Sequence, residues 1–480
     1  MQASTEQTME TMTEVPTLKE KLCSVYEQNR SLISAGDLPF ITELREKAFT
    51  HFKKLGFPHQ GLEAWKGTSL DKVLSHNFGL SLTPLAEEVD AEEIFKCEIP
   101  NFETLLVTQL NGWFVHNGQP IRQFPNGMII GSLANAMKKF PEIFEAHYGK
   151  YAKTENNGLN ALNTAFAIDG FFIYVPDNVH VEDVVQMVNV VSIPQDILIQ
   201  TRNLVVLGKN SSLKLVQCDD TIDHMHSFIN TVSEVVIGEN SSLDHYKLQN
   251  KDDKSTLINN ISFHLTDNSN LTTSAITLNG GLVRNNINVL IDGEYCTANV
   301  NGLYLMDKNQ HIDNHVFVDH IKPNSTSNEL FKGILDDSST GVFNGHVMVR
   351  KDSQHTLAYQ KNRNVLLTDK AAMDSRPFLE IYADDVKCSH GATIGQLDES
   401  AIFYMRQRGI PADEARALLL YAFAGEVINQ IRIPVLAERI NEMVRKRLRG
   451  ELSTCDDCAL HCKYQNNAPC VIDLSNIQLT

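Results

Sequence analysis

Three short segments of this sequence are near-copies of one another, and they constrain the fold more than any other feature. The segments are Leu207-Gly-Lys-Asn-Ser-Ser-Leu213, Ile237-Gly-Glu-Asn-Ser-Ser-Leu243 and Leu265-Thr-Asp-Asn-Ser-Asn-Leu271, and their closing leucines are 30 and 28 residues apart. A strand–turn unit that recurs at nearly constant spacing cannot bury its apolar face alone, but stacked copies can. The repeat therefore predicts a right-handed parallel β-helix whose polar turns are stacked in register.

The pattern of residue types along the sequence sets the expected first and last residues of this β-helix. From about residue 166, short Val/Ile/Leu-rich runs alternate with Gly, Asn, Asp and Ser, and long helical patterns do not return before residue 397. Gly and Asn suit such turns because both tolerate positive φ. An antiparallel β-sandwich also has short strands with turn signals and remains the alternative. The turn repeat favours the β-helix, and we expect it to span residues 166–397.

Helical patterns flank the β-rich region on both sides. Residues 1–165 are expected to be mainly helical with some strands, because apolar residues recur at helical spacing from Leu18 to Phe52 before Gly56-Phe-Pro58. A second helical module is expected over residues 398–450, where Gly409 is a suitable helix stop and Pro411 a suitable helix start. The remaining residues, 451–480, form a cysteine-rich tail.

The most distinctive chemical groups, Cys388 and His390, lie two residues apart near the end of the β-rich region. On a strand, residues i and i+2 point to the same side, with Cα atoms roughly 6.5 Å apart. The thiol and the imidazole could therefore face one metal ion together. Two ligands leave a tetrahedral iron or zinc centre half filled, so a metal site here requires ligands from elsewhere. The alternative is a buried cysteine beside a hydrogen-bonded histidine.

The segment around Cys388 and His390 resembles a known family signature. It reads Tyr382-Ala-Asp-Asp-Val-Lys-Cys-Ser-His-Gly-Ala-Thr, and it is similar to the C-terminal signature of the SufB/SufD family of the SUF iron–sulfur cluster assembly machine. Within that family it resembles the SufD branch. Four further motifs support the resemblance, which covers roughly residues 40 to 440. They are Gln396-Leu-Asp-Glu with Phe403-Tyr404 and Arg408-Gly409-Ile410, then Gly341–Val349, Asn314–His320, and Pro58 followed by Glu63-Ala-Trp65-Lys-Gly-Thr68.

Two motif positions resemble SufD rather than its paralogue SufB. SufB-like chains have His-Glu-Ala-Thr where this sequence has His390-Gly391-Ala-Thr, and Gln-Cys-Asp-Ser where it has Asn362-Arg-Asn-Val365. The cysteine and the glutamate expected of the main cluster-building subunit are therefore missing. The resemblance implies that His390, together with Cys388, faces SufB and holds a transient iron–sulfur cluster shared with it.

The resemblance also implies the partners of this chain. It suggests a non-catalytic scaffold that pairs with SufB and docks the ATPase SufC, and the sequence leaves a homodimer open for conditions without SufB. We expect Phe403, Tyr404, Arg408 and Gly409 to contact SufC. The chain has no G-x-x-x-x-G-K-[ST] motif, so we expect no bound nucleotide and an ATP hydrolysis step supplied by SufC.

The tail carries its own candidate metal site. Cys455, Cys458, Cys462 and Cys470 follow a C-x₂-C-x₃-C-x₇-C pattern, and four thiols complete a tetrahedral zinc or iron–sulfur site. A redox-active pair and an unbound tail are the alternatives. An independent metal-binding or redox protein acting through this tail is thus the second functional hypothesis. His224/His226 and His311/His315 also have chelating spacing, but histidines in such strand–turn segments often hydrogen-bond locally.

Composition excludes several other classes. The formal net charge is −17, with 42 Lys+Arg against 59 Asp+Glu, so the chain repels phosphate backbones and anionic membranes. We found no apolar run of ~20 residues and no secretory signal, and nine mostly scattered cysteines indicate a reducing cytoplasm. A β-helix enzyme acting on polysaccharides is disfavoured because such enzymes are usually secreted and line a groove with carboxylates.

Overall fold

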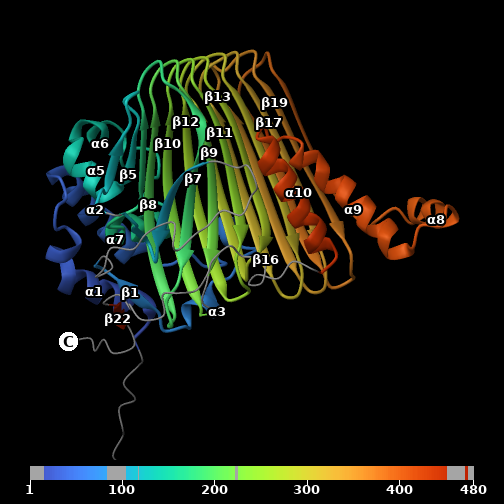
Figure 1. The fold of residues 1–480 in the computed structure, drawn as a ribbon, viewed down its shortest axis with the longest axis horizontal. Helices are drawn as coiled ribbons and strands as arrows, with labels where there is room; N and C mark the ends of the chain where they lie inside the picture. Colours follow the sequence, from blue (N-terminus) through green and yellow to red (C-terminus); the bar gives the residue numbers. More distant parts are fainter. Residues whose placement is uncertain (1–15, 84–103, 117, 222–224, 451–470, 474–480) are drawn as a thin grey trace, which may run out of the picture.

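The computed structural model describes residues 16–83, 104–116, 118–221, 225–450 and 471–473. Consecutive strands alternate between two sheets, and within each sheet neighbouring strands are parallel through most of the molecule. The chain thus coils into a β-solenoid of about 7 turns (Figure 1). This confirms the predicted parallel β-helix class and excludes the β-sandwich, whose neighbouring strands would be antiparallel.

The long strands form the walls of the solenoid. In the first sheet they are β6 (Phe171–Val175), β8 (Ile197–Leu207), β10 (Ser227–Ile237), β12 (Ser255–Leu265), β14 (Leu282–Ile291), β16 (His311–His320), β18 (Thr340–Val349) and β20 (Ala372–Ile381). In the second they are β7 (His180–Val191), β9 (Ser212–Thr221), β11 (Ser242–Asn250), β13 (Asn270–Asn279), β15 (Thr297–Met306), β17 (Thr326–Leu335), β19 (Leu357–Leu366) and β21 (Lys387–Gly395).

The sequence repeat corresponds to one corner of the solenoid. Leu243 is in register with Leu213 on one side and with Leu271 on the other, and all three leucines are buried. The preceding asparagines, Asn210, Asn240 and Asn268, adopt φ values of 52°, 56° and 55°. The Asn240 amide donates to the Asn210 side-chain oxygen at 3.1 Å. The corner is therefore an asparagine ladder, which satisfies polar turn groups from rung to rung.

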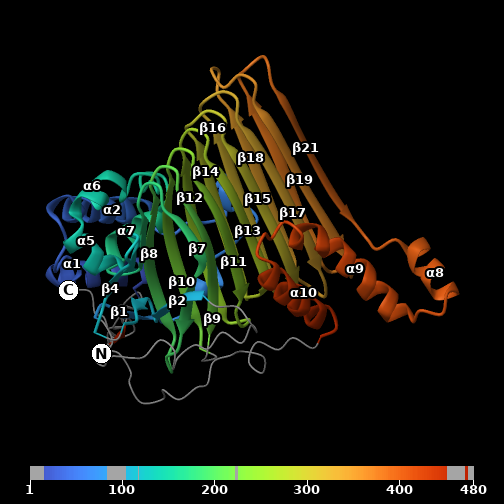
Figure 2. The same ribbon diagram turned by 45° about the horizontal axis from the view of Figure 1, so that its top comes forward.

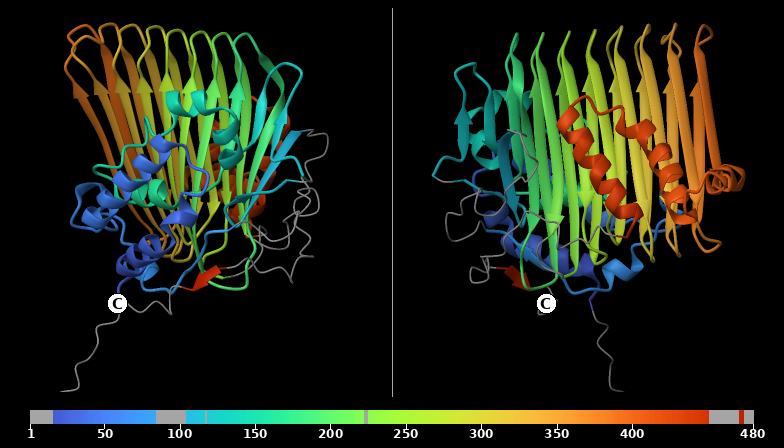
Figure 3. Two further views of the ribbon diagram at one scale, coloured as in Figure 1. Left: turned by 90° about the vertical axis from the view of Figure 1, so that its left-hand side faces the viewer. Right: turned by 45° about the vertical axis from the view of Figure 1, so that its right-hand side comes forward.

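The solenoid is capped at the end where it begins. β2 (Thr104–Leu110) pairs with β7 and with β3 (Trp113–Phe114), while β5 (Ile129–Ser132) joins β6 and β4 (Ile121–Gln123) in antiparallel pairing. Helices of the N-terminal region cover one face of the first sheet (Figure 3, left). The helices are α1 (Leu18–Ile33), α2 (Pro39–Leu55), η1 (Glu63–Trp65), α3 (Asp71–Leu74), α5 (Leu133–Lys139), α6 (Pro141–His147) and α7 (Gly158–Phe166).

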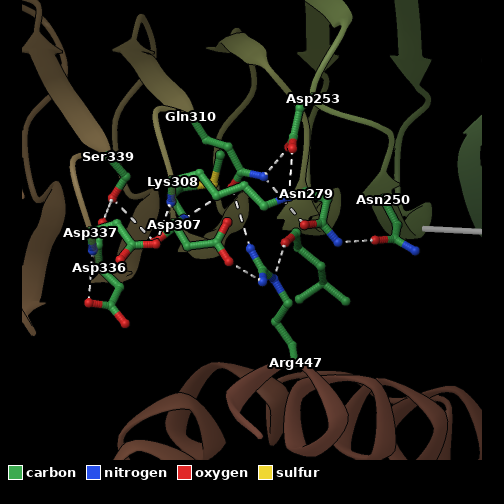
Figure 4. Close-up of polar contacts among 12 residues, drawn as sticks. Asn250, Asp253, Asn279, Asp307, Lys308, Gln310, Asp336, Asp337, Ser339 and Arg447 are labelled. Atoms are coloured by element: carbon green, nitrogen blue, oxygen red, sulfur yellow. Dashed lines mark hydrogen bonds and ion pairs between the residues drawn. The ribbon is translucent and has the colours of Figure 1, made fainter. Parts of the chain in front are cut away.

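The remaining helices lie on the second sheet. α9 (Ala412–Ile428) and α10 (Pro434–Leu448) pack against outward-facing apolar side chains of this sheet (Figure 3, right). Figure 4 shows how Arg447 of α10 reaches the solenoid turns: its guanidinium donates to Asp307 at 2.5 Å and to the Leu278 carbonyl at 2.9 Å. The preceding helix, α8 (Glu399–Gln407), projects beyond the last strands (Figure 2).

Two short strands complete the described structure. β22 (Val471–Asp473) pairs antiparallel with β1 (Gly79–Ser81), which also pairs with β8. The chain therefore returns, after its C-terminal helices, to the capped end of the solenoid. No helix among the described segments combines the length and the hydropathy that crossing a bilayer requires.

Candidate functional site

Among the described residues, no further rung follows β20 and β21 at their end of the solenoid. β21 is the outermost described strand of its sheet and pairs with β19, with Cys388 opposite Ala358 and His390 opposite Gln360. Ala358 and Gln360 are buried inside the solenoid, with 0% and 1% of their surface exposed. Because parallel in-register strands keep equivalent side chains on one face, Cys388 and His390 lie on the interior side of the last rung.

The missing rung leaves these interior positions open to solvent. Cys388 is half-buried against the edge of the core, and burial raises the pKa of its thiol. His390 is exposed. The structure thus places the thiol and the imidazole on one face, as the i, i+2 spacing requires, and at a surface that another chain can reach.

Apolar side chains around the pair are exposed for the same reason. Ile381 and Ile394 are 40% and 47% exposed, although their register partners Val349 and Asn364 on the preceding rungs are buried. Tyr382, which follows β20, is 59% exposed. Exposed apolar groups that continue a hydrophobic core are typical of a surface that another protein covers.

A row of polar residues leads from His390 into the solenoid. Glu329 on β17 is in register with Gln360, which is in register with His390. The Gln360 amide donates to Glu329 Oε2 at 2.7 Å. Burial raises the pKa of Glu329 to about 8. Sequence reasoning missed Glu329 and Gln360, because a polar residue in a strand is ordinarily assigned to the solvent face; only the register could have identified them.

The proposed SufC-contact residues lie on and after the projecting helix. Phe403 and Tyr404 of α8 are 63% and 61% exposed. The Arg408 guanidinium donates to the Tyr404 hydroxyl at 3.1 Å and lies 5.3 Å from the centre of its ring. Gly409 has a φ of +86° and ends the helix, as its position predicts. The helix therefore presents two large aromatic groups, and the Arg408 contacts help to hold the Tyr404 ring in place.

The tail cysteines and the two histidine pairs, the other candidate metal ligands, are not brought together with Cys388 and His390 among the described residues. Cys455, Cys458, Cys462 and Cys470 lie outside the described residues, as does His224. His315 contacts Asp313 on its own strand at 3.1 Å, as expected for local bonding, whereas His311 hydrogen-bonds to Thr68 of the N-terminal region at 2.8 Å and to Thr340 on the next rung at 2.6 Å. Four positions apart on one strand, these two histidines are roughly 13 Å from each other and cannot share an ion.

Comparisons with known proteins agree with the geometry. The family model described as "SUF system FeS cluster assembly, SufBD core domain" matches residues 191–423, and "SufBD protein N-terminal region" matches residues 16–187. An iron–sulfur cluster assembly SufBD family protein of Synechocystis is 29% identical over 88% of this chain and 94% of its own length. The SufD proteins of Bacillus subtilis and Escherichia coli are 26% and 31% identical, over 90% and 51% of this chain and over 100% and 58% of their own lengths.

Proposed function

The chain belongs to the SufB/SufD family of iron–sulfur cluster assembly proteins, and from this premise we propose that it is a non-catalytic SufD-type scaffold. Its uncapped end, formed by β20 and β21, pairs with SufB, and the two chains complete one ligand shell around a nascent cluster. The cluster is cargo, which this chain holds transiently and does not retain. ATP hydrolysis is supplied by SufC, which docks on the C-terminal helices.

The observation that carries the proposal is the position of Cys388 and His390 on the last rung. Their interior-facing side chains would be sealed if another rung followed, but here they are half-buried and exposed. One thiol and one imidazole are two of the four ligands that a tetrahedral iron centre takes. A second chain that continues the sheets from β20 and β21 would pair the unpaired strand edges and bring the missing ligands.

The test is anaerobic cluster reconstitution on the complex co-expressed with SufB and SufC. We expect His390→Ala to leave the complex intact and to lower bound iron and sulfide about tenfold, because an incomplete shell holds metal weakly. His180→Ala is the matched control: His180 is also exposed on a strand of the second sheet, but near the capped end. Ultraviolet–visible and Mössbauer spectra measure the cluster.

Two outcomes would contradict this proposal. If the chain is a monodisperse monomer that binds neither SufB nor SufC, it is not a scaffold of this kind. If instead His390→Ala and Cys388→Ala leave the cluster unchanged, and serine at Cys455, Cys458, Cys462 and Cys470 abolishes it, the chain acts through its tail. That outcome favours the second hypothesis, an independent metal-binding or redox protein.

Docking of SufC gives a separate prediction. Replacing both Phe403 and Tyr404 with serine is expected to weaken binding to SufC about 30-fold or more, because exposed aromatic anchors that become buried in an interface commonly contribute 2 kcal/mol or more. Thermal stability of the isolated chain should not change, since both rings are exposed. Leu32→Ala is the control, at an exposed apolar residue of α1, which lies at the opposite end of the molecule from α8 (Figure 2). Equal SufC affinity in all three proteins would exclude α8 from the interface.

A further inference from the structure

Three potential metal ligands meet near the capped end of the solenoid, well away from His390. Asp196 immediately precedes β8, His226 immediately precedes β10, and His76 lies in the segment just before β1. One ligand atom from each residue can be chosen so that all three lie within 4.8 Å of one another. β8 and β20 are separated by five strands of the same sheet, so this cluster is distinct from the uncapped end.

The distances within the cluster fit coordination better than hydrogen bonding. His226 Nδ1 lies 3.4 Å from Asp196 Oδ1, and His76 Nδ1 lies 3.6 Å from Asp196 Oδ2. Both separations exceed the 2.7–3.2 Å of a normal N–H···O hydrogen bond. Ligand atoms around a tetrahedral ion with bonds of about 2.0–2.1 Å are about 3.3 Å apart. Each imidazole nitrogen is therefore spaced from a different oxygen of the Asp196 carboxylate as two ligand atoms of one ion are.

The two imidazole rings approach the carboxylate together. Their centres are 4.0 Å apart and their planes differ by 29°, so the rings are stacked. Stacked rings on one side of the carboxylate can both direct a ring nitrogen to one cation.

Backbone contacts hold the three residues in place without a metal. The Gly79 amide donates to the Asp196 carbonyl at 2.8 Å, and the Ile197 amide donates to the His226 carbonyl at 3.0 Å. The His226 amide donates to Asp196 Oδ1 at 2.9 Å. The His76 amide donates to the Val73 carbonyl at 3.2 Å, so each of the three residues has a backbone contact and binding an ion requires little rearrangement.

The cluster opens into a cleft that leaves room for a further ligand. His76 and His226 line a cleft of about 680 Å³ together with Phe78, and their side chains are 34% and 37% exposed. The next rung carries Lys254 at the position in register with His226, so the row of ligands ends after two rungs. Three protein ligands and an open position describe an exchangeable site rather than a sealed structural one.

We propose that His76, Asp196 and His226 bind one divalent transition-metal ion, with the remaining coordination position open to the cleft. Two imidazoles and one carboxylate are the ligand set that proteins use for Zn²⁺ and Fe²⁺. The site belongs to this chain alone and needs no second subunit. It revises the sequence-based interpretation of His226, which favoured local hydrogen bonding.

The test is titration of the metal-free full-length chain with Co²⁺, whose visible absorption reports coordination geometry and whose near-ultraviolet charge-transfer bands report thiolate ligands. Serine at Cys455, Cys458, Cys462 and Cys470 removes the competing tail thiols. We expect one Co²⁺ per chain without thiolate bands, displaced by Zn²⁺. An anaerobic Fe²⁺ titration then shows whether the site binds Fe²⁺ or Zn²⁺ more tightly.

Three variants and one matched control make the assignment specific. His76→Ala, His226→Ala and Asp196→Asn should each weaken binding about tenfold or more. Asp196→Asn keeps an oxygen for the His226 amide, so it separates loss of the ligand from loss of the fold, which circular dichroism checks. His346→Ala is the control because His346 also contacts one carboxylate, Glu380 at 3.1 Å, but belongs to no three-residue cluster among the described residues. Unchanged Co²⁺ binding in the three variants, or none at micromolar ion, would overturn the proposal.

The His76–Asp196–His226 site and the cluster site at the uncapped end can be disproved independently of each other. The metal site is tested on the isolated chain, whereas the cluster site at the uncapped end requires SufB. Loss of Co²⁺ binding in His226→Ala with normal cluster formation would support both proposals together.

Discussion

Replacing Arg202 with methionine is expected to lower the free energy of unfolding by about 3–5 kcal/mol, the usual loss when one partner of a buried ion pair is removed. The guanidinium donates to Glu234 at 2.6 Å and to the Thr164 hydroxyl at 2.6 Å. Neither side chain of the ion pair has any exposed surface. Burial alone would raise the pKa of Glu234, but Arg202 holds it below its ordinary value. Without Arg202, a buried carboxylate would lose its counter-ion.

This ion pair also joins two parts of the molecule. Glu234 on β10 accepts hydrogen bonds from the backbone amides of Gly149, Tyr151 and Ala152, in the loop between α6 and α7, at 2.8–3.1 Å. The Arg202→Met change should therefore loosen the N-terminal helices on the first sheet as well as destabilise the solenoid. Hydrogen exchange of the backbone amides around Tyr151 would detect the loosening.

Chemical denaturation measures the loss, with Lys209→Met as the control. Lys209 pairs with Glu239 at 2.9 Å in a similar rung-to-rung contact, but its side chain is 63% exposed. Removing an exposed pair should change stability by about 1 kcal/mol or less. Adding Glu234→Gln to Arg202→Met should restore part of the loss, since the unpaired charge is then gone. Equal effects of Arg202→Met and Lys209→Met would disprove the argument.

The second large effect is the contribution of Glu329 to the free energy of unfolding, which declines as pH rises. Burial raises the pKa of this carboxyl group from 4.5 to about 8. Between these values the folded chain keeps the proton and the unfolded chain has lost it, so folding is favoured less as pH rises. The contribution is fully present below pH 4.5 and is lost as pH rises to about 8. At about 1.4 kcal/mol per pH unit, the total is about 4–5 kcal/mol.

Glu329→Gln should remove this slope, because glutamine keeps the shape and the hydrogen bond with Gln360 but does not titrate. Denaturation curves at pH 5 and pH 8 test it. We expect the variant to lose several kcal/mol less than the wild type between the two values. Glu239→Gln, at an exposed carboxyl group, should behave like the wild type. A Glu329→Gln variant whose stability changes with pH as the wild type's does would contradict the raised pKa, because buried histidines such as His245 and His320, whose pKa values burial lowers to about 3 and about 4, are common to both proteins.

The fold was predictable because it is a repeat. A near-constant period of 28–30 residues is visible in the sequence, and the same period sets the register of Leu213, Leu243 and Leu271 in the structure. The shared face of Cys388 and His390 was predictable for a similar reason, since alternation along a strand follows from backbone geometry alone. Their place near the end of the solenoid followed from the return of helical patterns after residue 397, whereas their exposure on the last described rung needed the structure.

The buried polar row and the three-residue cluster could not be predicted from the sequence. Glu329 and Gln360 lie inside the solenoid, although their residue types are usually exposed, and only strand register reveals that they form one row with His390. His76, Asp196 and His226 are far apart in the chain and come from three different connecting segments. Asp196 and His226 are 30 residues apart, one period of the solenoid, but no period relates His76 to them, so the cluster of three emerges only when β1, β8 and β10 are assembled.

The difference between the two ends of the solenoid limits how many chains can stack. At the β20–β21 end the outermost strands are long and belong to parallel sheets, whereas at the opposite end they are β3 and β4, of two and three residues in antiparallel pairing. A coil with two bare ends could recruit copies without limit and grow into a fibre. If the β20–β21 edges take up a second chain as proposed, the short antiparallel edges of β3 and β4 give a third chain little to pair with, so end-to-end stacking is expected to stop at two units.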